Sequence, residues 1–206
     1  MSTNSQAQQQ SRQLSRQQLR LDIRLSRRQL SKKQQLLHSR LIAKNLHLSR
    51  HYRQVKDIAF YLAEDGEIDT TLAIKKAWHD KKRVYLPVLS PFANELFFAP
   101  YTANTRMKNN RFGIAEPAVS IRQCKRAHQL QLVCMPLVGF DLQFNRLGMG
   151  GGFYDRSLHF RAQQKSWCHP KLIGLAHECQ KLDSVPTEPW DIPVDGILTE
   201  NNYYKA

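Results

Sequence analysis

The feature that most constrains the fold is a run of four glycines within five residues, 148–152, between an apolar segment and an amphipathic one. Arg146 precedes these glycines, and Phe153, Tyr154 and Asp155 follow them. Glycines allow backbone N–H groups to approach a ligand closely, and a helix beginning directly afterwards adds the positive end of its dipole. The pattern predicts a phosphate-binding turn between a strand and a helix; a glycine-rich turn without a ligand is the alternative.

Two common glycine signatures are excluded by spacing. A dinucleotide-binding fingerprint needs glycine at its first, third and sixth positions, but Phe153 occupies the sixth position counted from Gly148. A Walker-type loop needs Gly-Lys followed by Ser or Thr, and the sequence contains no such loop here. The run therefore belongs to another type of phosphate loop.

Strand and helix patterns alternate along the chain. Compact apolar runs predict strands at 58–62, 83–89, 130–135, 171–177 and 194–198, with shorter strands near 96–99 and around Ile114. Helical patterns fall at 69–81 and 153–163. This alternation predicts a three-layer α/β/α fold with a mainly parallel, Rossmann-like sheet, in which ligands bind at the carboxyl ends of the strands.

The amino-terminal quarter has a different composition. Residues 1–14 are rich in Gln and Ser without an apolar pattern, which predicts a flexible tail. From Ser15 apolar residues recur at helical spacing, and Ser31 can cap a second segment, so we expect one long helix or two consecutive helices. With 206 residues, of which 41% are hydrophobic, residues 15–206 are expected to form a single domain.

The net charge of +14 is concentrated at the amino terminus. Residues 1–56 contain thirteen Lys or Arg and a single acidic residue, Asp22, whereas residues 57–206 are nearly neutral at +2. A solvated helix face is the commonest reason for such a run, but a basic helix also attracts polyanions such as nucleotides, polyglutamates or RNA. An RNA-binding protein using this basic segment is the alternative function, although Tyr52 is the only aromatic residue within 1–56.

Membrane and disulfide signals are weak. The sequence has no apolar run of eighteen residues, and its first residues lack the apolar core of a secretory signal, so we expect a cytoplasmic protein that does not bind membranes. The spacing of the cysteines matches neither a metal knuckle nor a disulfide framework, which favours reduced thiols. They are Cys124, Cys134, Cys168 and Cys179.

Several separated motifs together resemble one family. The glycine run after a predicted strand, the basic first helix and the segment Ile192-Pro-Val-Asp195 are similar to the 5-formyltetrahydrofolate cyclo-ligase (5,10-methenyltetrahydrofolate synthetase) family of bacterial type. The resemblance implies conversion of 5-formyltetrahydrofolate, with or without a polyglutamate tail, into 5,10-methenyltetrahydrofolate. ATP is the implied cosubstrate and Mg²⁺ the implied metal, with ADP and phosphate as products. Phosphorylation of the formyl oxygen would precede ring closure by N10. A monomer that binds no nucleic acid is expected.

The resemblance also implies site residues. The implied ATP contacts are Arg16, Arg20, Arg146, Leu147, Gly148, Met149, Gly150, Gly151, Gly152, Phe153 and Tyr154. The implied folate contacts are Leu62, Glu67, Met149, Gly150, Gly151, Gly152 and Phe153. Asp155 and Asp195 are the implied magnesium ligands, and Arg146 and Tyr154 the implied catalytic residues. Arg16 and Arg20 are one helical turn apart, so both guanidinium groups can reach one triphosphate.

Structural alternatives exist for most of these residues. The arginines can be surface residues, Leu62 and Phe153 core residues, and Asp155 and Asp195 acids at a helix start and a turn. Many relatives carry lysine at the positions of Gly151 and Arg16 and tyrosine at that of Phe153. Without the lysine in the loop, phosphate neutralisation is expected to fall to Arg146, Arg16, Arg20 or Mg²⁺. His177 is interpreted as structural, and a small-molecule kinase is a further alternative that shares the ATP site.

Overall fold

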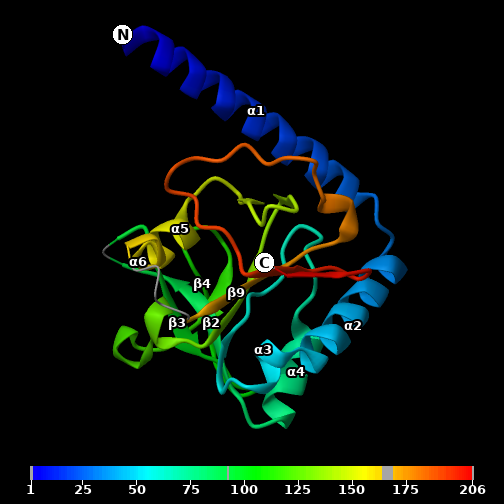
Figure 1. The fold of residues 1–206 in the computed structure, drawn as a ribbon. Helices are drawn as coiled ribbons and strands as arrows, with labels where there is room; N and C mark the ends of the chain where they lie inside the picture. Colours follow the sequence, from blue (N-terminus) through cyan, green and yellow to red (C-terminus); the bar gives the residue numbers. More distant parts are fainter. Residues whose placement is uncertain (1, 92, 164–168, 206) are drawn as a thin grey trace.

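A seven-stranded mixed sheet forms the centre of the computed structural model, which describes residues 2–91, 93–163 and 169–205, with side chains from Ser15 onward (Figure 1). The strand order is β11-β10-β9-β6-β1-β2-β3. Neighbouring strands from β10 to β2 run parallel, whereas the edge strands β3 and β11 are antiparallel to their neighbours. The strands are β1 (Asp57–Ala59), β2 (Arg83–Leu89), β3 (Leu96–Pro100), β6 (Leu132–Pro136), β9 (Lys171–Leu175), β10 (Gly196–Leu198) and β11 (Tyr203–Lys205). The predicted α/β architecture with a mainly parallel sheet is confirmed.

The remaining elements lie around this sheet. Two small antiparallel pairs are formed by β4 (Met107–Asn109) with β5 (Ala115–Pro117) and by β7 (Gly139–Phe140) with β8 (Arg146–Leu147). The α-helices are α1 (Ser2–Arg28), α2 (Lys32–Leu48), α3 (Arg50–Arg53), α4 (Thr71–His79), α5 (Phe153–Leu158) and α6 (Phe160–Gln163). Short 3₁₀ helices are η1 (Ile121–Gln123), η2 (Ala127–Gln129) and η3 (Glu178–Gln180).

The two faces of the sheet carry separate hydrophobic clusters. In β1 and just beyond it, Ile58 and Phe60 belong to the cluster under α2, α3 and α4, whereas Ala59 between them belongs to the cluster under α5 and η2. Side chains alternate between faces along a strand, so a continuous apolar run fills both clusters. This double burial explains why the central strands are apolar throughout and why helices cover both faces (Figure 1).

A capping box separates the first two helices. The Ser31 hydroxyl accepts the Gln34 backbone N–H at 3.3 Å, and the Gln34 side chain accepts the Ser31 N–H at 3.0 Å. The expected pair of consecutive helices is therefore observed. The first helix begins at Ser2, earlier than the boundary expected at Ser15, because residues 2–14 contain neither Gly nor Pro and Gln has good helix propensity. Flexibility of the tail stays a prediction.

Other sequence expectations differ in detail. The helix expected over 153–163 is divided into α5 and α6, and the edge strand β11 was not expected. Within the described parts of the chain, no helix is both long and apolar enough to cross a membrane. Cys124, Cys134 and Cys179 are free thiols, and Cys168 lies outside the described residues.

Candidate active site

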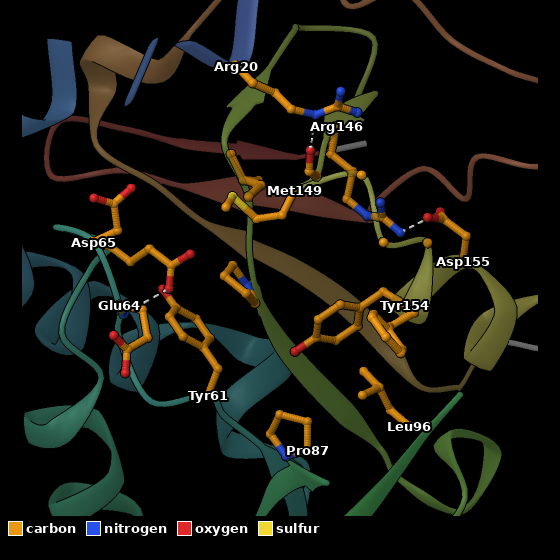
Figure 2. A pocket seen from close by; sticks show the side chains of 18 of the residues that line it. Arg20, Tyr61, Glu64, Asp65, Pro87, Leu96, Arg146, Met149, Tyr154 and Asp155 are labelled. Carbon is orange, nitrogen blue, oxygen red and sulfur yellow. Dashed lines mark hydrogen bonds and ion pairs between the residues drawn. The ribbon is translucent and has the colours of Figure 1, made fainter. Parts of the chain in front are cut away.

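A pocket of about 1050 Å³ opens at the carboxyl ends of β1, β2 and β6. Tyr61 and Leu62 follow β1, Pro87 lies on β2 and Leu137 follows β6, and all four line it. The glycine loop (residues 148–152) and α1 form the opposite wall (Figure 2). Small-molecule sites usually measure about 300–1,000 Å³, so this pocket is as large as the largest of them.

The glycine loop requires glycine at two positions. Gly150 and Gly152 have φ angles of 97° and 63°, which side chains rarely adopt. A Cβ atom on Gly150 would also lie 3.5 Å from the Arg20 guanidinium, whose Nε donates a hydrogen bond to the Gly148 carbonyl at 2.7 Å. Helix α1 and the loop are thus held together by Arg20. Since α5 has only six residues, the positive charge at the loop comes chiefly from arginines.

Four arginines of α1 line the pocket from one side. Arg16, Arg20, Arg24 and Arg27 follow one another at intervals of four, four and three residues, which places them on one helix face. The Asp65 carboxylate accepts from Arg24 at 2.7 Å and from Arg27 at 3.1 Å. The sequence reasoning identified the first two arginines and missed the others, although the same spacing continues through them.

Arg27 is the most unusual of these arginines because it is fully buried. Its Nη2 group donates to Asp65, whereas its Nε and Nη1 groups have no hydrogen-bond partner among the described residues. An unsatisfied buried donor is costly, so such groups usually serve a ligand or an ordered water. Arg27 is therefore available to a polar group that enters the pocket.

Arg16 is paired with an acidic residue that the sequence reasoning missed. Its Nη1 and Nη2 groups donate to the two Asp191 carboxylate oxygens at 2.7 and 3.4 Å. Asp191 also accepts the Glu188 backbone N–H at 2.8 Å, and both acidic residues line the pocket. Asp191 could have been considered from the sequence, because it lies only four residues before the expected metal ligand Asp195, in the motif Trp190-Asp191-Ile192-Pro193.

Arg146 and Asp155 form a buried ion pair beside the glycine loop. Arg146 Nη2 donates to Asp155 Oδ1 at 2.7 Å, and the Ile192 backbone N–H donates to the same oxygen at 3.1 Å (Figure 2). The side chains are 5% and 15% exposed, respectively. Both line the pocket, so the structure brings these two predicted residues to one place.

Asp195, the second implied magnesium ligand, is not among the residues that line the pocket. Asp195 directly precedes β10 and accepts the backbone N–H of Leu172, at the amino end of β9, at 2.8 Å. Because β9 and β10 are parallel, both observations place Asp195 at the sheet edge opposite the pocket. Its carboxylate is taken by Arg161, at 2.8 and 3.0 Å, and by Lys171, at 3.2 Å. Asp195 therefore lies away from the pocket, whereas Asp191, whose neighbour Ile192 donates its N–H to Asp155, lines it. A magnesium role for Asp195 stays a prediction.

Most other predicted residues lie on the pocket wall. They are Leu62, Glu67, Gly148, Met149, Gly150, Gly151, Gly152, Phe153 and Tyr154. Leu147 is the exception, because its fully buried side chain packs with Ile23, Val138 and Val185 beneath α1 instead of lining the pocket. A Cβ atom on Gly151 would lie 2.8 Å from the Phe153 ring, so a side chain at Gly151 requires Phe153 to move.

The inner wall carries hydroxyl and carboxyl groups. Figure 2 shows the Tyr154 hydroxyl directed into the pocket toward Tyr61. Burial raises the pKa of Tyr154 and of Tyr61, so both hydroxyls remain protonated donors. Burial also raises the pKa of Glu67 to about 7, even though the Glu64 N–H and Arg27 oppose this effect. The Glu67 carboxyl can thus be a donor or an acceptor near neutral pH.

The raised pKa of Glu67 can be tested by measuring how the substitution Glu67→Gln changes the free energy of unfolding at different pH values. The pKa of about 7 in the fold lies above the ordinary 4.5, so the folded state holds the proton more tightly than the unfolded chain. The free energy of unfolding therefore falls as pH rises from 4.5 to about 7 and stays lowered above it. We expect Glu67→Gln to be more stable than wild type by about 1–3 kcal/mol at about pH 8, with little difference at about pH 4. Urea unfolding at both pH values measures this, and an equal difference at both would contradict it.

The structure is that of an α/β protein with a pocket at the carboxyl ends of its parallel strands. A glycine loop, arginines and carboxylates line this pocket, as in proteins that bind phosphorylated ligands. The family model described as the 5-formyltetrahydrofolate cyclo-ligase family matches residues 12–200. The chain is 43% identical over 184 residues to the 5-formyltetrahydrofolate cyclo-ligase of Haemophilus influenzae, covering 89% of this chain and 96% of the relative. It is 38% identical over 186 residues to that of Escherichia coli, covering 89% and 99%.

Two solved structures are also similar to this chain over most of its length. The Aquifex aeolicus 5,10-methenyltetrahydrofolate synthetase superposes with a TM-score of 0.77 at 28% identity, covering 92% of each chain. The Mycoplasma pneumoniae 5,10-methenyltetrahydrofolate synthetase gives a TM-score of 0.69 at 25% identity, covering 90% of this chain and 98% of that one. The chain therefore belongs to the 5-formyltetrahydrofolate cyclo-ligase family and is an enzyme of that ligase class.

Proposed function

We propose that the chain uses ATP and Mg²⁺ to convert 5-formyltetrahydrofolate into 5,10-methenyltetrahydrofolate, ADP and phosphate within this pocket. The main observation behind the proposal is that a single pocket of about 1050 Å³ has two chemically different walls. The glycine loop and the arginines of α1 suit a triphosphate. The opposite wall, with Leu62, Tyr61 and Glu67, combines an apolar surface with hydrogen-bonding groups and suits a pteridine.

The nucleotide contacts follow from charge and backbone geometry. Arg20 is hydrogen-bonded to the Gly148 carbonyl, and Arg146 extends from the start of the loop toward Asp155 (Figure 2). Arg16 lies one helical turn from Arg20 and also lines the pocket. Guanidinium groups form paired hydrogen bonds to phosphate oxygens, and glycine amides can add neutral donors. Because four arginines of the basic helix line this pocket, a small polyanionic ligand accounts for them better than RNA does.

The residues present also fit a divalent cation. Asp155, Glu188 and Asp191 line the same pocket as the glycine loop, and carboxylates together with phosphate oxygens and water are the ligands that Mg²⁺ prefers. We propose Asp155 and Asp191 as the holding residues, with Asp191 in place of Asp195. The bound cation would neutralise charge that develops on the phosphate oxygens.

The chemistry requires positioning and charge neutralisation by the protein. In the proposed first step the formyl oxygen attacks the γ-phosphorus, and the bond to the bridging oxygen breaks to release ADP. N10 then attacks the formyl carbon and loses its proton, and the formyl carbon–oxygen bond breaks to release phosphate. Arg146 and Arg20 would stabilise the transferring phosphoryl group, and the Tyr154 hydroxyl would donate a hydrogen bond in the pocket.

The test follows the near-ultraviolet absorption of the methenyl product with purified protein, 5-formyltetrahydrofolate, Mg²⁺ and ATP. We expect an absorbance rise that requires ATP and is accompanied by one equivalent each of ADP and phosphate. No rise from folded protein that still binds ATP would overturn the proposal.

Oxygen transfer distinguishes the proposed route from simple ATP hydrolysis. Substrate labelled with ¹⁸O in the formyl group is expected to transfer that oxygen to the released phosphate, because the formyl oxygen becomes bonded to phosphorus. Mass spectrometry of the phosphate measures this. A stable phosphorylated folate without phosphate release would instead identify a kinase.

A further inference from the structure

Three potential metal ligands from separate elements meet away from the pocket wall just described. They are His38 on α2, His177 two residues after β9 and Glu200 two residues after β10. The two histidine Nδ1 atoms are 2.8 Å apart, and His38 Nδ1 lies 3.4 Å from Glu200 Oε1. One ligand atom from each residue falls within 4.8 Å of the others. In a tetrahedral zinc site with bonds of about 2.0–2.1 Å, neighbouring ligand atoms are about 3.3 Å apart, so small side-chain adjustments suffice.

The hydrogen bonds around His177 prepare its Nδ1 atom for a metal. Its Nε2 atom lies 3.1 Å from the Gly66 carbonyl oxygen, which can only accept, so Nε2 carries the proton. The lone pair of Nδ1 is then directed at His38. Metal-binding histidines commonly donate their second ring N–H to a backbone carbonyl in this way, which fixes the tautomer and the ring orientation.

The other ligands are also held in place. Glu200 Oε2 accepts the Glu178 backbone N–H at 3.0 Å, which orients the carboxylate and leaves Oε1 facing His38. His177 is fully buried, and the side chains of His38 and Glu200 are 14% and 10% exposed.

We propose that His38, His177 and Glu200 form a binding site for a zinc-class divalent transition metal, separate from the Mg²⁺ of the proposed reaction. Two imidazoles and one carboxylate suit Zn²⁺ or Co²⁺ and disfavour Mg²⁺, which prefers oxygen ligands. Three protein ligands leave a fourth position for water.

The metal site would stabilise the turn around Gly66, whose neighbours Asp65 and Glu67 line the pocket. His177 is hydrogen-bonded to Gly66, and the residues on either side of Gly66 are Asp65, which holds Arg24 and Arg27, and Glu67. A metal that binds the folded chain and joins α2 to the loops after β9 and β10 stabilises this turn by mass action. Its role is therefore structural support of the pocket.

Co²⁺ titration of the full-length chain, prepared without a polyhistidine tag, tests the proposal. We expect the visible absorption of tetrahedral Co²⁺ to saturate at one equivalent, Zn²⁺ to abolish it, and excess Mg²⁺ to leave it unchanged. His38→Ala and Glu200→Gln are each expected to weaken Zn²⁺ binding at least about tenfold, since even outer-shell changes cost about 10- to 100-fold. Glu200→Gln keeps the size and hydrogen-bond acceptor of the side chain, so its fold is expected to be retained.

Two matched variants are the controls. His79→Ala removes an exposed histidine, and Cys179→Ser removes an exposed thiol close in sequence to His177; both are expected to bind Zn²⁺ as wild type does. Absence of a saturable Co²⁺ band, or equal Zn²⁺ affinity in wild type, His38→Ala and Glu200→Gln, would overturn the site. Binding that disappears in Cys179→Ser would assign the ion to the thiol and overturn it as well.

Discussion

Asp155→Asn is expected to lower kcat by roughly 10²–10³-fold, the usual cost of removing one preorganised charge-stabilising group. Asp155 lines the pocket beside the glycine loop, and the substitution removes its negative charge. Asn retains an acceptor oxygen for Arg146 Nη2 and the Ile192 N–H, which both donate to Asp155 Oδ1, so the local geometry is expected to remain. Initial rates across a range of Mg²⁺ concentrations measure the effect, and part of the loss is expected to be recovered at high Mg²⁺.

Asp195→Asn is the matched control, because it makes the same chemical change at the opposite edge of the sheet. Asp195 is paired with Arg161 and Lys171, so its replacement is expected to cost stability, about 1–3 kcal/mol, and to leave kcat near the wild-type value. A large kcat loss in Asp195→Asn with a small one in Asp155→Asn would contradict the assignment of Asp155 and Asp191 as the metal-holding pair.

The central sheet could be predicted from the sequence because strands buried on both faces consist of continuous apolar runs. Strand β2 matches the expected range 83–89, and α4 and β9 fall within expected ranges. A parallel strand buried on both faces must be apolar throughout, and the helices between such strands need an apolar face, so both patterns are visible in one sequence. The glycine loop was equally visible, because the backbone at Gly150 and Gly152 requires glycine.

Edge strands and helix breaks were not predictable in the same way. Strand β11 is half-exposed and only three residues long, so it carries no apolar run. The break between α5 and α6 falls at His159, within a continuous helical pattern that contains no Gly or Pro. Tertiary packing decides such boundaries, and a local pattern does not contain that information.

The position of Asp195 relative to the pocket depends on topology. Asp195 directly precedes a parallel strand, and residues before a parallel strand lie at the amino edge, away from ligands. That rule was available once the strand had been predicted, but Ile192-Pro-Val-Asp195 was interpreted by resemblance alone. The arginine spacing that includes Arg27 and the motif that contains Asp191 were visible in the sequence. Their partners, Asp65 and Arg16, needed the structure because each lies far away along the chain.

Arg146→Met is expected to reduce both stability and activity strongly. Arg146 is almost fully buried and neutralises Asp155. Among the described residues, its removal leaves the carboxylate with the Ile192 N–H as its one remaining donor. Breaking a buried ion pair from one side costs about 3–5 kcal/mol. Loss of a guanidinium beside the glycine loop is expected to lower kcat/KM by roughly 10²–10³-fold as well. Urea unfolding and steady-state rates measure the two effects.

Combining Arg146→Met with Asp155→Asn separates these effects. The double variant no longer contains an unpaired buried charge, so its free energy of unfolding is expected to return to within about 1–2 kcal/mol of wild type. Its activity is expected to stay as low as that of either single variant. The Arg146 guanidinium that stabilises the phosphoryl group and the Asp155 carboxylate that would hold Mg²⁺ are both absent. Recovery of activity together with stability would mean that the pair only supports the glycine loop. Failure of stability to recover would instead show that Arg146 stabilises the loop through contacts other than Asp155, since the charge imbalance would already be gone.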